Sequence, residues 1–379
     1  MKTEWVHKKL GDDDVAKIIM GQSPSSASYN DENIGLPFLQ GCADFGEVFP
    51  KTSVYCNEPL KVAPQNSILM SVRAPVGTIN KADQKYIIGR GLCSIVSLIN
   101  NDYLYYYLLQ NKNRLEQKAQ GSTFLAINSA EVNDFDVSYP ESLSTQRRIA
   151  AILTSADKVI AATQKTIAKY KQIKQGMMED LLNEQCTMNN VQWRKVKLGE
   201  CCESELGKTL DEGRNTGLYR PYLCALNVLW GKIDRSTIKR MRIEDSELER
   251  YLVKKGDLLV CEGGEIGRCA IWDYDDVIYY QNALHRVRFY DGYDARFFMY
   301  LLCHYNDLKL IEQYGKGLTI KHLNQTAFRN IPVCVPDLAE QRRIAAILSG
   351  IDAKIAAEKK VLEKYEKVKK GLMERLLEE

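Results

Sequence analysis

The sequence has no apolar segment that approaches the roughly 18 residues needed to cross a bilayer. Its first residues, MKTEWVHKKLGDDD, also lack the apolar core of a secretory signal peptide. These two absences argue against a membrane-spanning or secreted protein. We therefore expect a cytoplasmic protein with no membrane partner.

Cysteine and histidine do not occur at metal-binding spacings. The 11 cysteines are odd in number and form no CxxC pair, which favours reduced, mostly buried thiols over a disulfide framework or a zinc site. The four histidines are scattered, and none has cysteine or carboxylate neighbours at ligand spacing. We therefore predict no metal site.

Sequence signatures of catalysis are incomplete. The segment LGKT at 206–209 resembles the end of a phosphate-binding loop, but the glycine that should precede it is missing. The segment GGEIG at 263–267 lacks the spacing of a dinucleotide site. There is no Asn-Pro-Pro-aromatic or Asp-Pro-Pro-aromatic segment of the kind that an amino-methyltransferase needs. The residues therefore argue against an enzyme, with a stand-alone enzyme that has an unrecognised site as the alternative.

A strong basic excess, which is common in DNA-binding proteins, is missing too. The 52 basic and 49 acidic residues leave a net charge of only +3. A surface that binds DNA must then be a local patch, or a partner must supply part of the positive field.

What the sequence does have is a long internal repeat. QRRIAAIL occurs at 146–153 and again at 341–348, and the match continues without a gap from 146–182 to 341–377. Weaker similarity precedes it: NSILMSVRAPVGTIN matches KGDLLVCEGGEIGRCA, which pairs Gly77 with Gly267. Each half opens alike, with EWVHKKLGD and QWRKVKLGE. The repeat predicts two similar folded units, each followed by a helix.

The two repeated segments have the apolar spacing of a coiled coil, alternating between three and four residues over five heptads. The predicted seams are Ile149, Leu153, Ala156, Ile160, Thr163, Ile167, Tyr170, Lys174, Met177 and Leu181, and Ile344, Leu348, Ile351, Ile355, Glu358, Leu362, Tyr365, Lys369, Leu372 and Leu376. If the second helix folds back on the first, the two run antiparallel and the halves are related by a pseudo-two-fold axis. About 38 residues at 1.5 Å per residue give a rod of roughly 57 Å.

Two glycines inside the predicted helices have two open interpretations. Gly176 and Gly371 mark either a bend or close approach of a partner, or a helix end followed by a short terminal helix. Asp337 and Glu340 have the spacing of a capping box at the start of the second helix.

The segments between the helices combine strands and helices. NSILMSV, GDLLVC, CSIVSLI and HRVRFY are typical of strands, and YLYYYLLQNKNRLEQ and RFFMYLLCHYNDLKLIEQ are typical of amphipathic helices. Their tyrosines and leucines are expected in the core rather than stacked on bases. The predicted class is α+β, with mixed units at 1–140 and 191–336, a central long helix and linker at 141–190, and a C-terminal long helix at 337–379.

The whole chain resembles the specificity subunit of type I restriction-modification systems. The motifs that carry the resemblance are SVRAPVG (71–77), IGRGLCSI (88–95), GDLLVCEGGEIGRCAIW (256–272), QNALHRVR (281–288) and the duplicated helices. The resemblance implies two target recognition domains, each reading half of a bipartite double-stranded DNA site. It implies that the antiparallel coiled coil sets the gap between the half-sites, and the length of the rod limits this gap to about 17 base pairs.

The resemblance also implies partners and no cofactor bound by the chain itself. Two modification subunits, which bind S-adenosylmethionine and methylate adenine, are expected to attach, and two restriction subunits with ATP-driven translocase and nuclease activity can join them. Two equivalent halves offer two equivalent docking surfaces, which agrees with two copies of a partner.

Residues that contact DNA are expected in turns after strands, because Arg, Lys, Asn and Gln there can reach phosphates or base edges. The candidates are Arg73, Lys81, Lys85 and Arg90 in the first unit, and Arg235, Arg268, Gln281, Asn282, His285, Arg286 and Lys321 in the second. For each of them a solvated surface charge or polar group is the alternative.

The repeated QRR triplets stand at the first helical turn, where positive charge opposes the helix dipole. We therefore predict partner-binding or phosphate-binding roles for Gln146, Arg147, Arg148, Gln341, Arg342 and Arg343, with salt bridges to neighbouring acidic residues as the alternative. For the whole chain, the alternative is a coiled-coil adaptor that bridges two proteins without reading DNA. That alternative explains the helices but not the two sizeable globular units.

Overall fold

The computed structural model describes residues 4–119, 126–183, 193–211, 213–315, 317 and 321–378. The chain divides into two units: Met1–Lys165 with Lys360–Glu379, and Thr166–Lys359. Each long helix therefore gives one part to each unit. The predicted linker at 184–190 lies outside the described residues.

In each unit, the first strand pairs with the last strand, just before the long helix begins. In the first unit β1 (Trp5–Lys9) pairs antiparallel with β11 (Asp136–Pro140), and in the second β12 (Arg194–Lys197) pairs with β23 (Pro332–Val335). The two matching opening motifs thus form the first strands of these pairs. The long helix follows directly after the second strand of each pair.

A four-stranded antiparallel central sheet has the same plan in both units. Its order is β2-β10-β7-β8 in the first and β13-β22-β19-β20 in the second. The predicted strand segments lie here, which confirms them. The bounds are β2 Ala16–Met20, β10 Leu92–Ser97, β7 Ile68–Ser71 and β8 Ile79–Lys81, then β13 Cys202–Leu206, β22 Leu284–Phe289, β19 Leu258–Cys261 and β20 Cys269–Ile271.

A second sheet, here called the outer sheet, is built from the segment inserted before the central β7 or β19 strand and from one later strand. Its order is β3-β5-β4-β9-β6 in the first unit and β17-β14-β21-β18 in the second. The bounds are β3 Tyr29–Asn30, β5 Tyr55–Cys56, β4 Leu36–Leu39, β9 Tyr86–Ile88 and β6 Val62–Ala63, then β17 Lys239–Ile243, β14 Leu218–Leu223, β21 Ile278–Tyr280 and β18 Leu252–Val253. A small pair, β15 (Val228–Leu229) and β16 (Lys232–Ile233), adds to the second unit.

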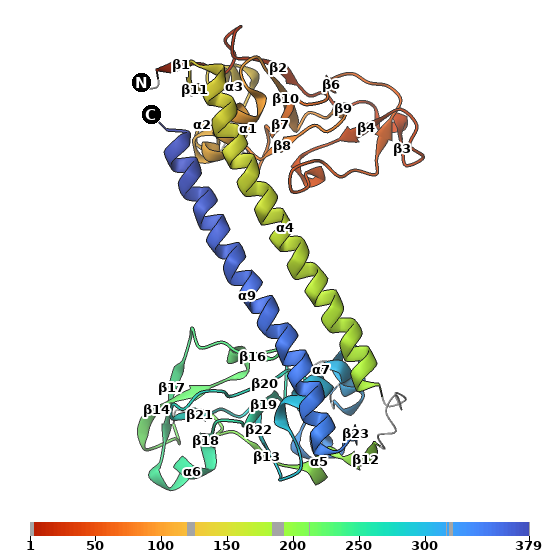
Figure 1. The fold of residues 1–379 in the computed structure, drawn as a ribbon, viewed down its shortest axis with the longest axis vertical. Helices are drawn as coiled ribbons and strands as arrows, with labels where there is room; N and C mark the ends of the chain where they lie inside the picture. The colour runs from red at the N-terminus through yellow and green to blue at the C-terminus, as the bar shows by residue number, and fades with distance from the viewer. Residues whose placement is uncertain are drawn as a thin grey trace. The chain divides into compact units, whose positions relative to one another are not determined.

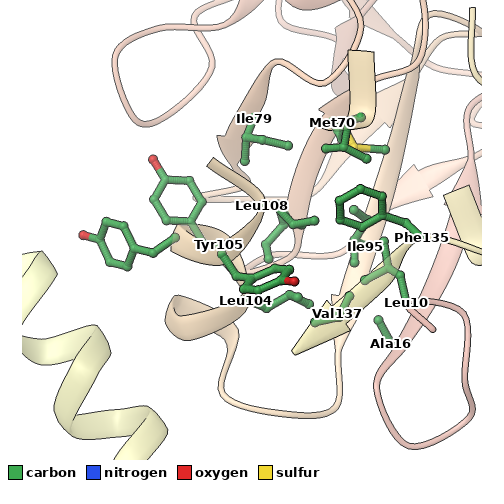
Figure 2. Close-up of a cluster of buried hydrophobic side chains, with 14 of the residues drawn as sticks. Leu10, Ala16, Met70, Ile79, Ile95, Leu104, Tyr105, Leu108, Phe135 and Val137 are labelled. Carbon is green, nitrogen blue, oxygen red and sulfur yellow. The ribbon is translucent and has the colours of Figure 1, made fainter. Parts of the chain in front are cut away.

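Helices cover the central sheets, and the unit cores lie between them. The first unit has α1 (Asn101–Gln110), α2 (Lys112–Lys118) and α3 (Ser129–Asn133); the second has α5 (Leu198–Cys201), α7 (Ala295–Asp307) and α8 (Gln325–Arg329), while its α6 (Leu248–Tyr251) lies beside the outer sheet. Figure 2 shows Leu104 and Leu108 of α1 packed with Ile95 of the sheet. The tyrosines of α1 are buried in this core, so their predicted place in the core is confirmed.

The matched glycines Gly77 and Gly267 occupy the same turn, between β7 and β8 and between β19 and β20. Their φ angles are 76° and 81°, a region that favours glycine. A Cβ atom would lie 3.1 Å from Leu115 Cβ at Gly77 and 2.8 Å from Ile311 Cδ1 at Gly267. The turns therefore need glycine for conformation and for space.

The long helices α4 (Leu143–Leu182) and α9 (Leu338–Leu376) are unbroken and antiparallel where they meet within a unit (Figure 1). In the first unit Ile149 and Leu153 of α4 share a core with Met373 and Leu377, from the end of the chain. In the second unit Met178 and Leu182 share a core with Ile344 and Leu348, from the start of α9. The antiparallel pairing predicted from the repeat is confirmed within each unit.

The predicted seam is right at the start of each helix and off by one residue at the end. Met178 and Leu182 are buried, whereas the predicted Met177 is 37% exposed. The same shift replaces Leu372 and Leu376, which are partly buried, by Met373 and Leu377. The reason is that a straight helix has 3.6 residues per turn and drifts from a strict heptad pattern.

Both glycines lie inside continuous helix, so their interpretation as helix ends is wrong. Apart from the adjoining backbone of the same helix, no described atom lies within 4 Å of a Cβ built at Gly176 or Gly371. Close approach by another part of the described chain therefore does not explain them. At the start of α9, the Glu340 N–H donates to Asp337 Oδ1 over 2.8 Å, but the Glu340 carboxylate turns to Arg343 instead of completing the box.

The ten described cysteines are free thiols, and all except Cys42 and Cys303 are buried. Among the described residues, no group of histidine, cysteine and carboxylate side chains has the arrangement of a metal site. None of the described helices is both long enough and apolar enough to span a bilayer.

Candidate nucleic-acid interface

The glutamines of the QRR triplets are buried structural residues. Gln146 is 2% exposed: its Oε1 accepts from the Asn100 N–H (2.9 Å) and its Nε2 donates to the Pro140 carbonyl (2.8 Å). Gln341 repeats this at 1% exposure, with the Asp294 N–H (2.8 Å) and the Pro336 carbonyl (2.9 Å). Asn100 and Asp294 are the N-caps of α1 and α7. The expectation that these glutamines face a partner is wrong, because both amides tie a unit to its own long helix.

The neighbouring arginines are exposed, as a partner-binding role requires. Arg147, Arg148 and Arg342 form no ion pair with any residue that the structure describes. Arg343 differs, since its guanidinium makes two 2.6 Å hydrogen bonds to the Glu340 carboxylate. Three of the four arginines thus remain candidates for an external contact, and Arg343 follows the salt-bridge alternative.

Of the four first-unit candidates, three lie in exposed positions and one does not. Arg73, Lys85 and Arg90 are exposed, in or beside turns. Lys81 belongs to β8, where its ammonium is 2.7 Å from Asp102 Oδ1 and 4.2 Å from the centre of the Tyr105 ring. The placement of Lys81 in a turn is wrong, because it is the last residue of β8. Its ammonium group already has a carboxylate partner within the unit.

Three second-unit candidates are held by neighbours at the surface. Arg235 pairs with Asp276 and lies 4.3 Å from the Tyr274 ring centre. Arg268 donates to the Ala225 carbonyl over 2.8 Å and pairs with Glu265. The exposed Lys321 is 3.4 Å from a Glu312 carboxylate oxygen. DNA would have to compete with these contacts.

Gln281 and Asn282 do form a turn between strands, as predicted. The backbone N–H of Gln281 donates to the Leu223 carbonyl (2.9 Å), and that of Asn282 to the Lys208 carbonyl (2.8 Å). The Lys208 ammonium itself is buried against the Glu247 carboxylate at 2.6 Å. Although burial opposes it, this contact holds the pKa of Glu247 below its usual range. The LGKT segment therefore supports the fold of this turn.

His285 and Arg286 are not in a surface turn, and that expectation is wrong. They lie within β22 and are 0% and 4% exposed. His285 Nε2 is 2.7 Å from the Leu323 carbonyl, and burial lowers the pKa of the ring. The Arg286 guanidinium donates to the Arg250 and Leu252 carbonyls and pairs with Glu205 at 3.0 Å. Arg286 therefore holds the outer-sheet segment at β18 to the central sheet, and His285 holds the backbone at Leu323, just before α8.

An exposed cationic surface of the second unit lies outside the predicted turns. It lies on edge strand β17, where Lys239, Arg240 and Arg242 are exposed while Met241 and Ile243 are buried. Arg240, Met241 and Arg242 border a cleft of about 490 Å³, which is also lined by Leu210, Asp211, Gly213, Asn215 and Thr216. The segment KRMRI alternates basic and apolar residues, and this period-two pattern could have revealed a strand with an exposed basic face.

Like the buried glutamines, a group of one tyrosine, one aspartate and one lysine recurs in both units and joins three helices in each. Asp157 of α4 accepts from the Tyr106 hydroxyl of α1 (2.6 Å) and pairs with Lys369 of α9 (2.5 Å). Asp352 of α9 accepts from the Tyr300 hydroxyl of α7 (2.8 Å) and pairs with Lys174 of α4 (2.7 Å). We call these the two Tyr–Asp–Lys groups. They explain the lysines predicted at equivalent seam positions.

Comparison with known proteins identifies one family for both halves of the chain. The sequence matches the type I restriction modification DNA specificity domain twice, over residues 2–172 and 190–367. These matches correspond to the two halves of the repeat.

A curated relative and two solved structures agree with this match. A stretch of 182 residues is 41% identical to the MjaX type I restriction enzyme specificity subunit of Methanocaldococcus jannaschii; it covers 47% of this chain and 43% of that relative, so the chain matches less than half of it. The fold is similar to the S subunit of a type I restriction-modification system from M. genitalium, with a TM-score of 0.66, 17% identity, and coverage of 100% and 97% of the two chains.

The other structure is a chain from work on complex assembly and conformational transition of the type I R-M system. It has a TM-score of 0.63 and 16% identity, with coverage of 100% of this chain and 99% of that one. The two domain matches together span most of this sequence. The chain therefore belongs to the type I restriction modification DNA specificity family and carries the specificity domain twice.

Proposed function

We propose that the protein is the DNA-recognition subunit of a type I restriction-modification complex and reads a bipartite double-stranded site. The observation that carries this proposal is the duplicated specificity domain, in which each copy has its own core and its own outer sheet. Each unit reads one half-site. The chain contributes recognition, and methylation and cleavage belong to partner subunits.

Two modification subunits bind the chain, one at each half, and two restriction subunits can join them. Support comes from the exposed arginines at equivalent positions, Arg147 and Arg342, which have no ion-pair partner among the described residues. Support also comes from the similarity to a chain whose structure concerns assembly of such a complex. S-adenosylmethionine and ATP bind to these partners, and a cytoplasmic location remains part of the proposal.

The test is to purify the chain with candidate modification subunits and to map methylated adenines in cells that carry both. We expect one two-part motif with a gap of fixed length, and a complex that protects a duplex bearing this motif. A chain that captures no methyltransferase, in a mixture that prefers no DNA sequence, would instead support the adaptor alternative.

The gap should depend on the length of the long helices. We expect that seven residues inserted after Lys165 in α4, together with seven after Lys360 in α9, keep the helix pairing and lengthen each helix by about 10.5 Å. This corresponds to about three base pairs. Insertion in α4 alone, near Lys165, should mispair the helices and abolish binding or lengthen the gap. Changed half-sites with an unchanged gap would contradict the role of the helices as a spacer.

Charge reversal tests the arginine contacts. We expect that Arg147→Glu with Arg342→Glu weakens assembly with the modification subunit or binding to DNA. Arg343→Ala is the matched control, because this arginine is paired with Glu340 in the same turn. Unchanged assembly and unchanged DNA affinity in the charge-reversed variant would exclude an external role for these residues.

A further inference from the structure

The outer sheets of the two units can be aligned residue by residue through their strand pairing. Phe38 of β4 lies opposite Ile87 in a parallel pair, and Tyr222 of β14 lies opposite Tyr279 in the same way. The residues before them, Pro37 and Pro221, are therefore equivalent. Pro37 lies opposite Tyr55 of β5, and Pro221 lies opposite Arg240 of β17.

The equivalent strands carry different chemistry. Arg240 corresponds to Tyr55, and Arg242, two residues further along β17, corresponds to Asn57, which directly follows β5. One unit thus presents two guanidinium groups where the other presents a phenol and an amide. Both positions lie toward the solvent side of their strands, because Met241 and Cys56 between them are buried.

The cleft beside β17 is cationic and holds its arginines without neutralising them. The Arg240 guanidinium donates to the Tyr219 carbonyl over 3.2 Å, and the Arg242 guanidinium lies 5.0 Å from the Tyr219 ring centre. Neither forms an ion pair with a described residue. The carboxylate that lines this cleft, Asp211, accepts from the Gly213 and Arg214 backbone N–H groups. Most donors of the two arginines therefore remain available.

A first-unit cleft of the same size, about 490 Å³, borders the aligned strand at Tyr55, the position of Arg240, but is almost neutral. Its rim has Thr52, Ser53 and Tyr55, with Lys51 as its cation. The Tyr86 hydroxyl donates to Asp83 over 2.6 Å, and burial raises the pKa of this tyrosine to about 12. Hydroxyl groups therefore dominate this cleft at neutral pH.

The sequence around the two clefts has the same asymmetry. The segment between β2 and β7 (21–67) has two basic and five acidic residues, a net charge of −3. The segment between β13 and β19 (207–257) has 11 basic and eight acidic residues, a net charge of +3. The acidic loop at 273–276 pairs with Arg235, Lys255 and Arg296 and leaves the β17 cations unpaired among the described residues.

We propose that the two units hold DNA unequally: Arg240 and Arg242 on β17 anchor the second half-site, whereas the first unit reads its half-site with neutral hydrogen-bonding groups. This inference rests on the proposed function. A two-stranded ribbon such as β14–β17 fits the major groove, and a guanidinium makes paired hydrogen bonds to phosphate oxygens or to guanine O6 and N7. In both cases the ligand is a pair of hydrogen-bond acceptors on DNA. The experiment below distinguishes phosphate oxygens from guanine base edges.

The experiment uses the complex with its modification subunit and a duplex bearing the mapped motif. The dissociation constant is measured at several salt concentrations for wild type, for Arg240→Gln with Arg242→Gln, and for Lys51→Gln, which removes the cation that lines the first-unit cleft. The double variant should bind at least tenfold more weakly. If the arginines contact phosphates, the slope of log K against log salt should fall by about 0.9 per lost contact, with the motif unchanged. If they contact guanines, the methylation motif should relax in the second half-site only.

A lysine pair separates these two arms. Arg240→Lys with Arg242→Lys should keep the salt slope if phosphates are the ligand, and should lose base selectivity if guanines are. The inference is overturned if the glutamine pair leaves affinity, salt slope and motif at wild-type values, or if Lys51→Gln has the larger effect. A wild-type complex that prefers no DNA sequence would instead overturn the proposed function.

Discussion

The two units share their attachments to the long helices and differ in how each outer sheet is fastened. Gln146 and Gln341 make the same two hydrogen bonds, and the Tyr–Asp–Lys groups recur in both. The interior of the central sheet does not repeat in this way. Strand pairing makes Ser94 equivalent to Arg286 and Ile19 equivalent to Glu205. The first unit thus has a serine beside an isoleucine where the second has an ion pair between buried Arg286 and partly buried Glu205.

The difference teaches which parts of the fold can vary after duplication. A residue that joins a unit to α4 or α9 must fit a helix whose sequence is itself repeated. A residue that joins the central sheet to the outer sheet must fit a segment that differs between the units. In the second unit Arg286 reaches the carbonyls of Arg250 and Leu252 in that segment. In the first, Ser94 Oγ only contacts Ser67 Oγ at 2.8 Å.

The sharpest way to test this comparison is to remove Arg286. Arg286→Ala should destabilise the second unit by about 3 kcal/mol, because it leaves the partly buried Glu205 and the Arg250 carbonyl without this donor, while the Leu252 carbonyl keeps Arg288. Hydrogen exchange should show faster exchange in β18 and β22, with protection of the first unit unchanged. Ser94→Ala is the matched control, and a loss of less than about 1 kcal/mol is expected there. Equal losses in the two variants would contradict the proposed difference.

The buried glutamines should instead behave alike. Gln146→Ala or Gln341→Ala should each cost about 1–3 kcal/mol, since each removes the acceptor of the N–H of a half-buried N-cap residue and the donor to a proline carbonyl. Chemical denaturation of each variant and of the pair measures this. Losses that differ strongly between the two positions would mean that the attachments are not equivalent. Arg147→Ala, at the exposed neighbouring position, is the control and should leave stability within about 0.5 kcal/mol of wild type.

These two cases also show what sequence reasoning could and could not reach. The strands and the helix pairing followed from periodicity, and the equivalence of Gly77 with Gly267 followed from the repeat. Gln146 was assigned outward because it stands beside two arginines at a helix start, and its partners are the backbone of Asn100 and Pro140. Arg286 was misplaced because its ion-pair partner lies 81 residues earlier. Side-chain partners from distant segments carry no local pattern, so burial of a polar residue is hard to predict.

Lowering the pH should reduce the free energy of unfolding of the second unit more than that of the first, and this difference should be smaller than the effects above. Burial lowers the pKa of His285, so below about pH 6.5 the unfolded chain takes up a proton that the folded chain does not, and stability falls as pH falls. The slope is at most about 1.4 kcal/mol per pH unit. The equivalent first-unit residue is Cys93, whose pKa burial raises to about 12, so it stays protonated in acid.

The measurement is the midpoint of denaturant unfolding of each unit between pH 5 and pH 7, followed by hydrogen exchange. His285→Gln should flatten the profile of the second unit, leaving the part due to His304, whose pKa burial also lowers. A profile that is equally steep in the first unit would show that other groups dominate the acid response.

The Tyr–Asp–Lys groups give the smallest expected effect and the strictest test of equivalence. Asp157→Asn and Asp352→Asn keep an acceptor for the tyrosine hydroxyl but lose the charge that holds Lys369 or Lys174. The carboxylates are 30% and 39% exposed, so solvent screens the pairs and each change should cost less than about 1 kcal/mol. Added salt should reduce the difference from wild type in the same way for both. If only one variant loses stability, the two Tyr–Asp–Lys groups do not stabilise their units equally. The two attachments to the long helices have then diverged, as the outer sheets have.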